Sequence, residues 1–258
     1  MSDNMAYSHP QASAPSGMET RLNFTLDYWC LWQSQQTSVT GGWPGGDVLP
    51  YNDGSADVSF LPVMQRRRLS PLARAVCAVV WRGRLAGGDM PTVFFSSHGE
   101  SQYYFEMLAG MAEGEPVSPT RFSLCVHNAI AGLSSIHTES FLPYVCLAGG
   151  SEGMFAAFLE AGGMLLEVPR VLVVCYEQAL PEVYQAYLST PDITWALAMV
   201  LTKSGGPGRQ LRLVREPACS PEYQDRQAAS FVQAILDGVR SSGCRLERSF
   251  WRWSLDDV

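Results

Sequence analysis

The sequence has few charges for its length, and features that would assign it to several common classes are missing. Of its 258 residues, 17% are charged and 47% are hydrophobic, whereas disordered chains combine low hydrophobicity with high charge. The net charge of −7 argues against a nucleic-acid partner. No apolar run reaches the ~18 residues of a membrane span, and residues 1–20 contain no hydrophobic stretch typical of a secretory signal. We therefore expect a folded protein with a disordered lead-in over residues 1–20.

Metal-binding patterns are also missing. The seven cysteines form no CxxC pair and mostly lie in apolar runs, which is typical of reduced core thiols in a cytoplasmic protein. The four histidines, at positions 9, 98, 127 and 137, have no metal-ligand spacing with acidic residues or cysteines. We expect neither a metal site nor a cofactor.

Apolar periodicity predicts strands that alternate with helices. Strands are expected at 22–32, 92–95, 144–147, 171–176 and 195–201. Helices are expected after Ser70-Pro71 and Ser118-Pro119, and over residues 151–164 and 221–240. This order favours a layered α/β fold, with helices on both faces of a five-stranded, mostly parallel or mixed sheet. The segment 204–209 is a turn and lacks the pattern of a phosphate loop.

Residues 122–137, FSLCVHNAIAGLSSIH, contain no Asp, Glu, Lys or Arg. A helix without a charged face has no side suited to water. We expect one helix that is buried all round, either in the core or at a subunit interface. Within it, His127 and Asn128 favour structural hydrogen bonds.

Two short motifs allow a chemical interpretation and a structural one. Residues 149–153, GGSEG, fit the G-x-S-x-G of a serine nucleophile elbow between a strand and a helix. That triad order requires a histidine after the serine, and no histidine follows Ser151. The other interpretation is a tight turn that needs glycine. The cluster Arg66-Arg67-Arg68 is either a solvated charge run or a docking site for an acidic partner or phosphate.

Three stretches, 61–76, 118–140 and 148–161, together resemble the N-terminal half of β-ketoacyl synthases. More narrowly, they resemble chain length factors of aryl polyene and related polyketide or fatty-acid-like pathways. The resemblance covers residues 22–202, and VHNAIAG at 126–132 matches a helix that packs across the subunit interface in this family. It implies half of a thiolase-like fold over residues 21–203. Residues 204–258 would then form a helix and a tail, with Trp251 and Trp253, that pack on this half domain.

The sequence departs from the family at the catalytic residues. The family's cysteine nucleophile falls at or beside Ser151, Cys146 lies within the preceding strand, and the family's two catalytic histidines belong to a C-terminal half that has no counterpart here. The resemblance therefore implies a non-catalytic subunit. It would pair with a full-length β-ketoacyl synthase as a heterodimer and shape its acyl tunnel, while an acyl carrier protein delivers substrate through the partner.

The resemblance also implies a role for individual residues. The partner interface would contain His127, Asn128, Ala131, Gly132 and Ser135. The tunnel wall would contain His137, Thr138, Phe141 and Leu142, although Phe141 could instead anchor its loop in the core. Arg66, Arg67 and Arg68 would dock the carrier protein. The alternatives are a serine esterase that uses Ser151 and an interaction protein without acyl chemistry.

Overall fold

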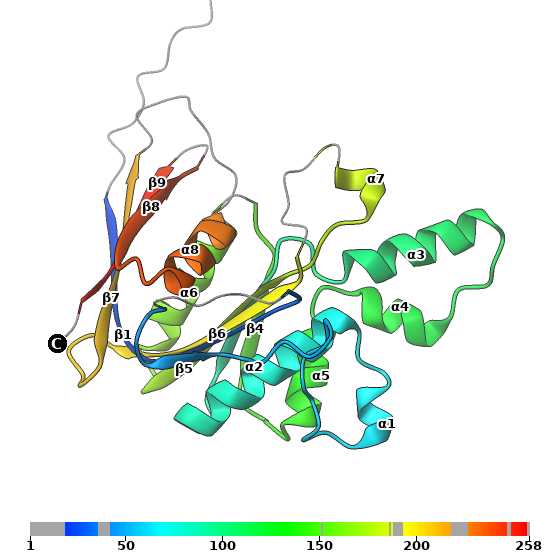
Figure 1. The fold of residues 1–258 in the computed structure, drawn as a ribbon, viewed down its shortest axis with the longest axis horizontal. Helices are drawn as coiled ribbons and strands as arrows, with labels where there is room; N and C mark the ends of the chain where they lie inside the picture. The colour runs from blue at the N-terminus through cyan, green and yellow to red at the C-terminus, as the bar shows by residue number, and fades with distance from the viewer. Residues whose placement is uncertain are drawn as a thin grey trace, which may run out of the picture.

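The computed structural model describes residues 19–35, 42–150, 152–185, 187, 193–217, 227–246 and 249–256. These residues form one mixed sheet with helices on both faces (Figure 1). The strands are β1 (Thr20–Gln33), β2 (Gly46–Val48), β3 (Thr92–Phe95), β4 (Tyr144–Leu147), β5 (Arg170–Glu177), β6 (Trp195–Lys203), β7 (Arg209–Pro217), β8 (Ser241–Arg245) and β9 (Ser249–Asp256). The helices are α1 (Val63–Arg66), α2 (Pro71–Gly87), α3 (Ser101–Ala112), α4 (Pro119–Cys125), α5 (Ala129–His137), α6 (Gly153–Met164), α7 (Glu182–Gln185) and α8 (Gln227–Leu236).

The five predicted strands are confirmed and are neighbours in the sheet, in the order β4-β3-β5-β6-β1. Strands β4, β3 and β5 are parallel, and β6 is antiparallel to both β5 and β1. The expected number of strands is wrong, because the described sheet has nine. β7, β9 and β8 continue it beyond β1, and β2 pairs with β1. The segment 204–258 thus contributes strands to the sheet as well as the helix α8.

Two hydrophobic cores lie on opposite faces of the sheet. One contains residues of α2 and α5, and the other contains residues of α6 and α8. Strand β5 supplies Val173 to one core and Leu172 to the other, which explains its uninterrupted apolar sequence. Helix α2 begins as predicted, with the Ser70 hydroxyl accepting the Ala73 amide and Pro71 in the first turn.

The C-terminal strands seal the face that holds α6. The ring of Trp251 on β9 stacks on Phe155 of α6, with centroids 4.1 Å apart and an interplanar angle of 2°. Trp253 packs edge-on against Phe231 of α8 at 5.3 Å. Large aromatic side chains contribute strongly to core energetics, so this cluster ties β9 and both helices together.

The expectation of one fully buried helix over residues 122–137 is wrong. Val126 has the extended ψ of 146° and ends α4, and α5 begins only at Ala129. The His127 ring nitrogen Nε2 lies 2.9 Å from the carbonyl oxygen of Leu147 at the end of β4. This tertiary bond holds the break in the helix. Helices α3 and α4 project beyond the sheet (Figure 1), and Phe122 and Ile136 are exposed.

Several predictions fall on residues outside the described part. These are the lead-in up to residue 18, Ser151 itself, and the start of the helix predicted at 221–240. Strand β1 already begins at Thr20, within the predicted lead-in, and α6 begins at Gly153. No helix among the described residues has both the length and the apolar character needed to cross a membrane.

Candidate functional site

The carboxyl ends of the three parallel strands meet at one edge of the sheet. Residues 96–100 follow β3, Gly149 and Gly150 follow β4, and Glu177 ends β5. Strand β3 lies between β4 and β5. The chain therefore moves one way along the sheet from β3 to β4 and the opposite way from β4 to β5. Ligands of open α/β sheets bind at this kind of switch point, which makes this edge the first candidate site.

Glu177 fixes the loop after β3. Its carboxylate accepts a hydrogen bond from the Ser96 hydroxyl at 3.2 Å and another from the Ser97 amide. The Ser96 oxygen in turn accepts the Gly99 amide at 2.7 Å. Glu177 is only 8% exposed, and burial raises its pKa to about 7 although these donors favour the charged form. The carboxyl group is therefore engaged with its own loop.

A second buried carboxyl group lies nearby in the same loop. Glu100 accepts a hydrogen bond from Ser70, the residue that caps α2, and burial raises the pKa of Glu100 to about 7. Sequence reasoning missed both glutamates. The one available signal was Glu177 as a single acid after the apolar run VLVVCY.

The glycines of the G-x-S-x-G motif have packing roles. A Cβ on Gly153 would lie 2.2 Å from the Phe95 ring, and one on Gly149 would lie 2.6 Å from the Gly153 Cα. Between them, Glu152 accepts two hydrogen bonds from Arg215, at 3.0 and 3.2 Å, and one from Ser249 at 2.6 Å. These contacts tie the turn to β7 and β9 and favour the structural interpretation.

The described thiols are poor nucleophiles. All six described cysteines are free. Burial raises the pKa of Cys146, the thiol closest in sequence to the turn, to about 11. Burial also raises the pKa of Cys30, Cys77 and Cys244 to about 12. Because the thiolate is the nucleophile, none of these four side chains is activated near neutral pH. Within the described ranges, no group of three or more His, Cys, Asp or Glu residues could hold a metal ion.

Exposed apolar side chains lie on β4, an edge strand of the described sheet, and on the chain segments that reach its two ends. We call these side chains the β4 surface and define it by Val126, Ile136, Phe141, Leu142 and Tyr144. The connections at the two ends of β4 carry it, since His127 bonds to Leu147 and the loop after α5 leads into Tyr144. Exposed apolar patches and unpaired strand edges are both typical of interaction sites.

The residues predicted for the partner interface divide between this surface and the core. Gly132 lies beside Tyr144, since a Cβ added to this glycine would lie 3.7 Å from the tyrosine hydroxyl. Ser135 is half-buried and donates to the Gly132 carbonyl at 2.9 Å. His127 is half-buried and Asn128 is exposed at the break before α5. Ala131 is 0% exposed and packs in the core with α2, so its assignment to the interface is wrong.

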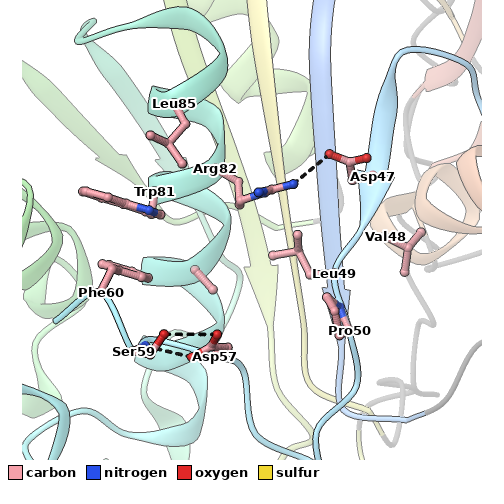
Figure 2. Close-up of a pocket in the computed structure, with 11 residues that line it drawn as sticks. Asp47, Val48, Leu49, Pro50, Asp57, Ser59, Phe60, Trp81, Arg82 and Leu85 are labelled. Carbon is pink, nitrogen blue, oxygen red and sulfur yellow. Dashed lines mark hydrogen bonds and ion pairs between the residues drawn. The ribbon is translucent and has the colours of Figure 1, made fainter.

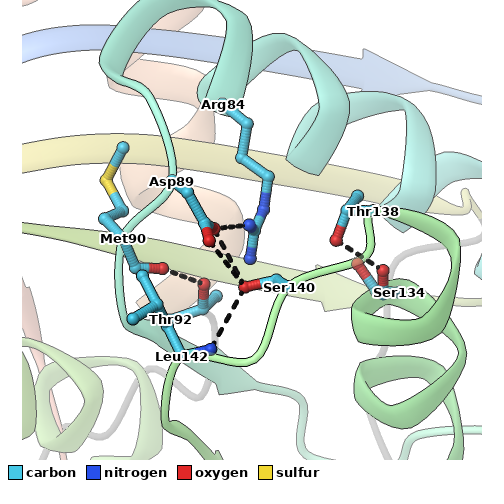
Figure 3. A network of polar contacts seen from close by, with 8 residues as sticks. All are labelled: Arg84, Asp89, Met90, Thr92, Ser134, Thr138, Ser140 and Leu142. Atoms are coloured by element: carbon cyan, nitrogen blue, oxygen red, sulfur yellow. Dashed lines mark hydrogen bonds and ion pairs between the residues drawn. The ribbon is translucent and has the colours of Figure 1, made fainter.

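The predicted tunnel-wall residues lie at the end of α5 and in the loop that follows. Thr138 donates to the Ser134 carbonyl at 2.8 Å, and Ser140 donates to Asp89, which pairs with Arg84 (Figure 3). Phe141 is 98% exposed, so it does not anchor its loop in the core. Neither ring nitrogen of His137 has a hydrogen-bond partner among the described residues, and burial lowers its pKa.

A groove that sequence analysis did not predict lies beside α2 (Figure 2). It has a volume of about 440 Å³. Stacked rings of Phe60 and Trp81, 4.6 Å apart, form one side, and Arg82 pairs with Asp47 at 3.2 Å. The predicted cluster Arg66–Arg68 lies elsewhere, from the end of α1 to the turn before α2, with Arg67 and Arg68 exposed.

The order β4-β3-β5-β6-β1, with helices on both faces, is half of a thiolase-like fold, the fold of condensing enzymes. The family model described as "Beta-ketoacyl synthase, N-terminal domain" matches residues 29–254. The chain therefore belongs to the β-ketoacyl synthase N-terminal domain family. No curated protein matches the sequence.

A solved structure shows the same fold. A chain from the ketosynthase ApeO in complex with its chain length factor ApeC, from Xenorhabdus doucetiae, has a TM-score of 0.73 at 22% identity. That match covers 90% of this chain and 99% of the other, so the two are of nearly equal length. The ishigamide ketosynthase/chain length factor matches with a TM-score of 0.48 at 10% identity, covering 72% of this chain and 59% of its own. At 22% identity, the likeness to the Xenorhabdus doucetiae chain shows the fold alone.

Proposed function

We propose that the protein is a non-catalytic subunit of the chain-length-factor type, which pairs with a full-length β-ketoacyl synthase. The observation that carries this proposal is the β4 surface, where apolar side chains remain exposed along an edge strand. The raised pKa of Cys146 supports the absence of a thiolate nucleophile. The near-equal length of the matched chain in a ketosynthase–chain length factor complex also supports the proposal.

In this proposal the partner supplies the cysteine and both histidines, and this chain contributes to the wall of the acyl tunnel in a polyketide pathway of the aryl polyene type. The wall residues are His137, Thr138, Phe141 and Leu142. A neutral imidazole suits an apolar tunnel, and burial lowers the pKa of His137 in that direction. An acyl chain gains about 0.8 kcal/mol per buried CH₂, so a bulky side chain limits product length once the chain reaches it.

Arg66, Arg67 and Arg68 form a docking site for the acyl carrier protein in the same proposal. Arg67 and Arg68 are exposed, and the guanidinium group matches carboxylate and phosphate oxygens. Charge reversal in an Arg67→Glu/Arg68→Glu variant is expected to slow acyl transfer without dissociating the subunits. Since exposed charge pairs act mainly on association rates, added salt should slow the wild type and affect the variant less.

Co-expression with a full-length β-ketoacyl synthase tests the pairing. We expect a heterodimer on size exclusion and condensation of malonyl thioesters only when both subunits are present. Ile136→Glu should dissociate the complex, because Ile136 is 67% exposed on the β4 surface and a charge there would be buried without a partner. Leu166→Glu changes another exposed apolar residue, which lies outside that surface, and should leave the heterodimer intact.

Two results would contradict the proposal. One is a wild-type chain that stays monomeric beside every full-length β-ketoacyl synthase with which it is co-expressed. The other is ester hydrolysis by the purified chain that is abolished by Ser151→Ala, which would favour the serine hydrolase instead.

A further inference from the structure

Phe141 lies at the tip of a turn that is bridged by a single hydroxyl group. Ser140 Oγ donates to Asp89 Oδ1 at 2.9 Å and accepts the Leu142 amide at 3.4 Å (Figure 3). The same oxygen therefore contacts the residue after Phe141 and a residue outside the loop. Asp89 is held in turn by its ion pair with Arg84 of α2, whose side chain is 14% exposed.

The backbone on both sides of this turn is also fixed. The Ser140 amide donates to the Ser135 carbonyl at 3.0 Å, five residues back, and Glu139 adopts a left-handed φ of 51°. This is the hydrogen-bond pattern of a Schellman helix end. After the turn, the Pro143 carbonyl accepts the Thr92 amide at 3.1 Å. The loop is thus attached to α5 at one end and to β3 at the other.

We infer that Asp89 is a positioning residue, which acts through Ser140 to hold Phe141 outward as a rigid anchor for an apolar pocket of the ketosynthase subunit. This inference rests on the proposed function. Aromatic anchors contribute a large share of interface energy. Holding such an anchor in its bound position before association reduces the entropy lost on binding. The clamp formed by Arg84, Asp89 and Ser140 provides that order.

The ketosynthase subunit is the occupant because the clamp lies next to the β4 surface. The loop after α5 leads directly into Tyr144, the first residue of the unpaired edge strand. A partner that covers this edge meets Phe141 at the same time. The residues beside Phe141 are held by an ion pair and two hydrogen bonds, yet the ring itself is 98% exposed and packs in no core of its own chain.

Hydrogen exchange on the isolated full chain tests the clamp without any partner. Ser140→Ala and Asp89→Ala should increase amide exchange in residues 139–142 about tenfold or more, because local opening follows the loss of local bonds. Ser204→Ala is the matched control, since its hydroxyl donates to Gln210 Oε1 at 2.8 Å in the distant β6–β7 turn. Exchange that is unchanged in Ser140→Ala, with an unchanged melting temperature, overturns the clamp.

A double-mutant cycle with the co-expressed full-length β-ketoacyl synthase tests whether the clamp acts through Phe141. Ser140→Ala should weaken binding about tenfold when Phe141 is present. It should have no effect in the Phe141→Ala background, because the anchor is already missing. An equal loss in both backgrounds overturns the positioning role. If the wild type binds no β-ketoacyl synthase, the proposed function and the assigned partner both fail, and the exchange experiment alone decides whether the clamp exists.

Discussion

Replacing Phe141 by alanine should change assembly without changing the stability of the isolated chain. The side chain is 98% exposed, so its removal should alter the free energy of unfolding by less than about 0.5 kcal/mol. Phe155→Ala is the matched control. Phe155 is 0% exposed and stacks on Trp251 at 4.1 Å, so its loss should cost about 3–5 kcal/mol.

The effect of Phe141→Ala on the complex follows from the area that the ring would bury. A phenylalanine buries about 200 Å², which at about 25 cal/mol per Å² is about 5 kcal/mol. Side-chain ordering and desolvation consume part of this. We expect a net loss of at least about 2 kcal/mol, or roughly a 30-fold increase in Kd. The remaining complex should release longer products, because the wall has lost a bulky side chain.

Three measurements check this reasoning: a melting curve of the isolated variant, calorimetric titration with the ketosynthase subunit, and mass spectrometry of the carrier-bound products. A loss of more than about 1 kcal/mol in the isolated Phe141→Ala chain would refute the exposed position of the ring. Unchanged affinity and unchanged product length in a well-folded complex would remove Phe141 from both the interface and the tunnel wall.

Further predictions concern the carboxyl edge of the parallel strands. Gly153→Ala should lower the free energy of unfolding by about 1–3 kcal/mol through overpacking. Gly150→Ala is the control and should melt like the wild type, because no atom lies within 4 Å of its added Cβ. Equal melting temperatures of the two variants would contradict a packing role for the motif. Burial raises the pKa of Glu177 from 4.5 to about 7, so its stabilising contribution is complete below about pH 4.5 and is lost as the pH rises through about 7. Denaturant titrations from pH 5 to 8 should show the free energy of unfolding falling with pH, and Glu177→Gln should reduce that fall. Burial opposes ionisation of Glu152, but its hydrogen bonds from Arg215 and Ser249 outweigh burial and lower its pKa. Arg215→Met should therefore lower the free energy of unfolding by about 1 kcal/mol at neutral pH. That loss should shrink as the pH falls through the lowered pKa of Glu152, and a loss that stays constant down to acid pH would refute this expectation.

The central part of the fold was predictable because the burial and the local hydrogen bonds of its residues can be recognised in the sequence around them. Strand β5 is buried on both faces, so its sequence is an apolar run bounded by charges. Ser70 and Pro71 specify the start of α2 by local hydrogen bonding and φ restriction. The added strands were harder to recognise. β7 carries Arg209 and Arg215 on partly exposed positions and Arg212 on an exposed one. Its place in the sheet depends on pairing with β1 and β9, which are far away in sequence.

The site was less predictable, because apolar composition does not separate core from interface. Ala131 and Ile136 lie in the same charge-free segment, yet one is fully buried and the other is 67% exposed. The difference arises from their positions on α5, because Ala131 lies on the face that packs in the core with α2 and Ile136 lies on another face of the same helix. Asp89 gave no sequence signal either, since its role depends on Ser140, which lies 51 positions further along the chain.

One face of the sheet is covered within the chain, whereas the edge at β4 is unpaired, and this difference supports the proposed assembly. The face that holds α6 is sealed within the chain, where Trp251 and Trp253 are almost completely buried against Phe155 and Phe231. Beyond β4 no described strand pairs with the sheet edge, and Ile136 and Phe141 are exposed. Stability and assembly therefore depend on different residues: substitution of Trp251 should unfold the isolated chain, whereas substitution of Ile136 should leave the monomer folded and act on the complex.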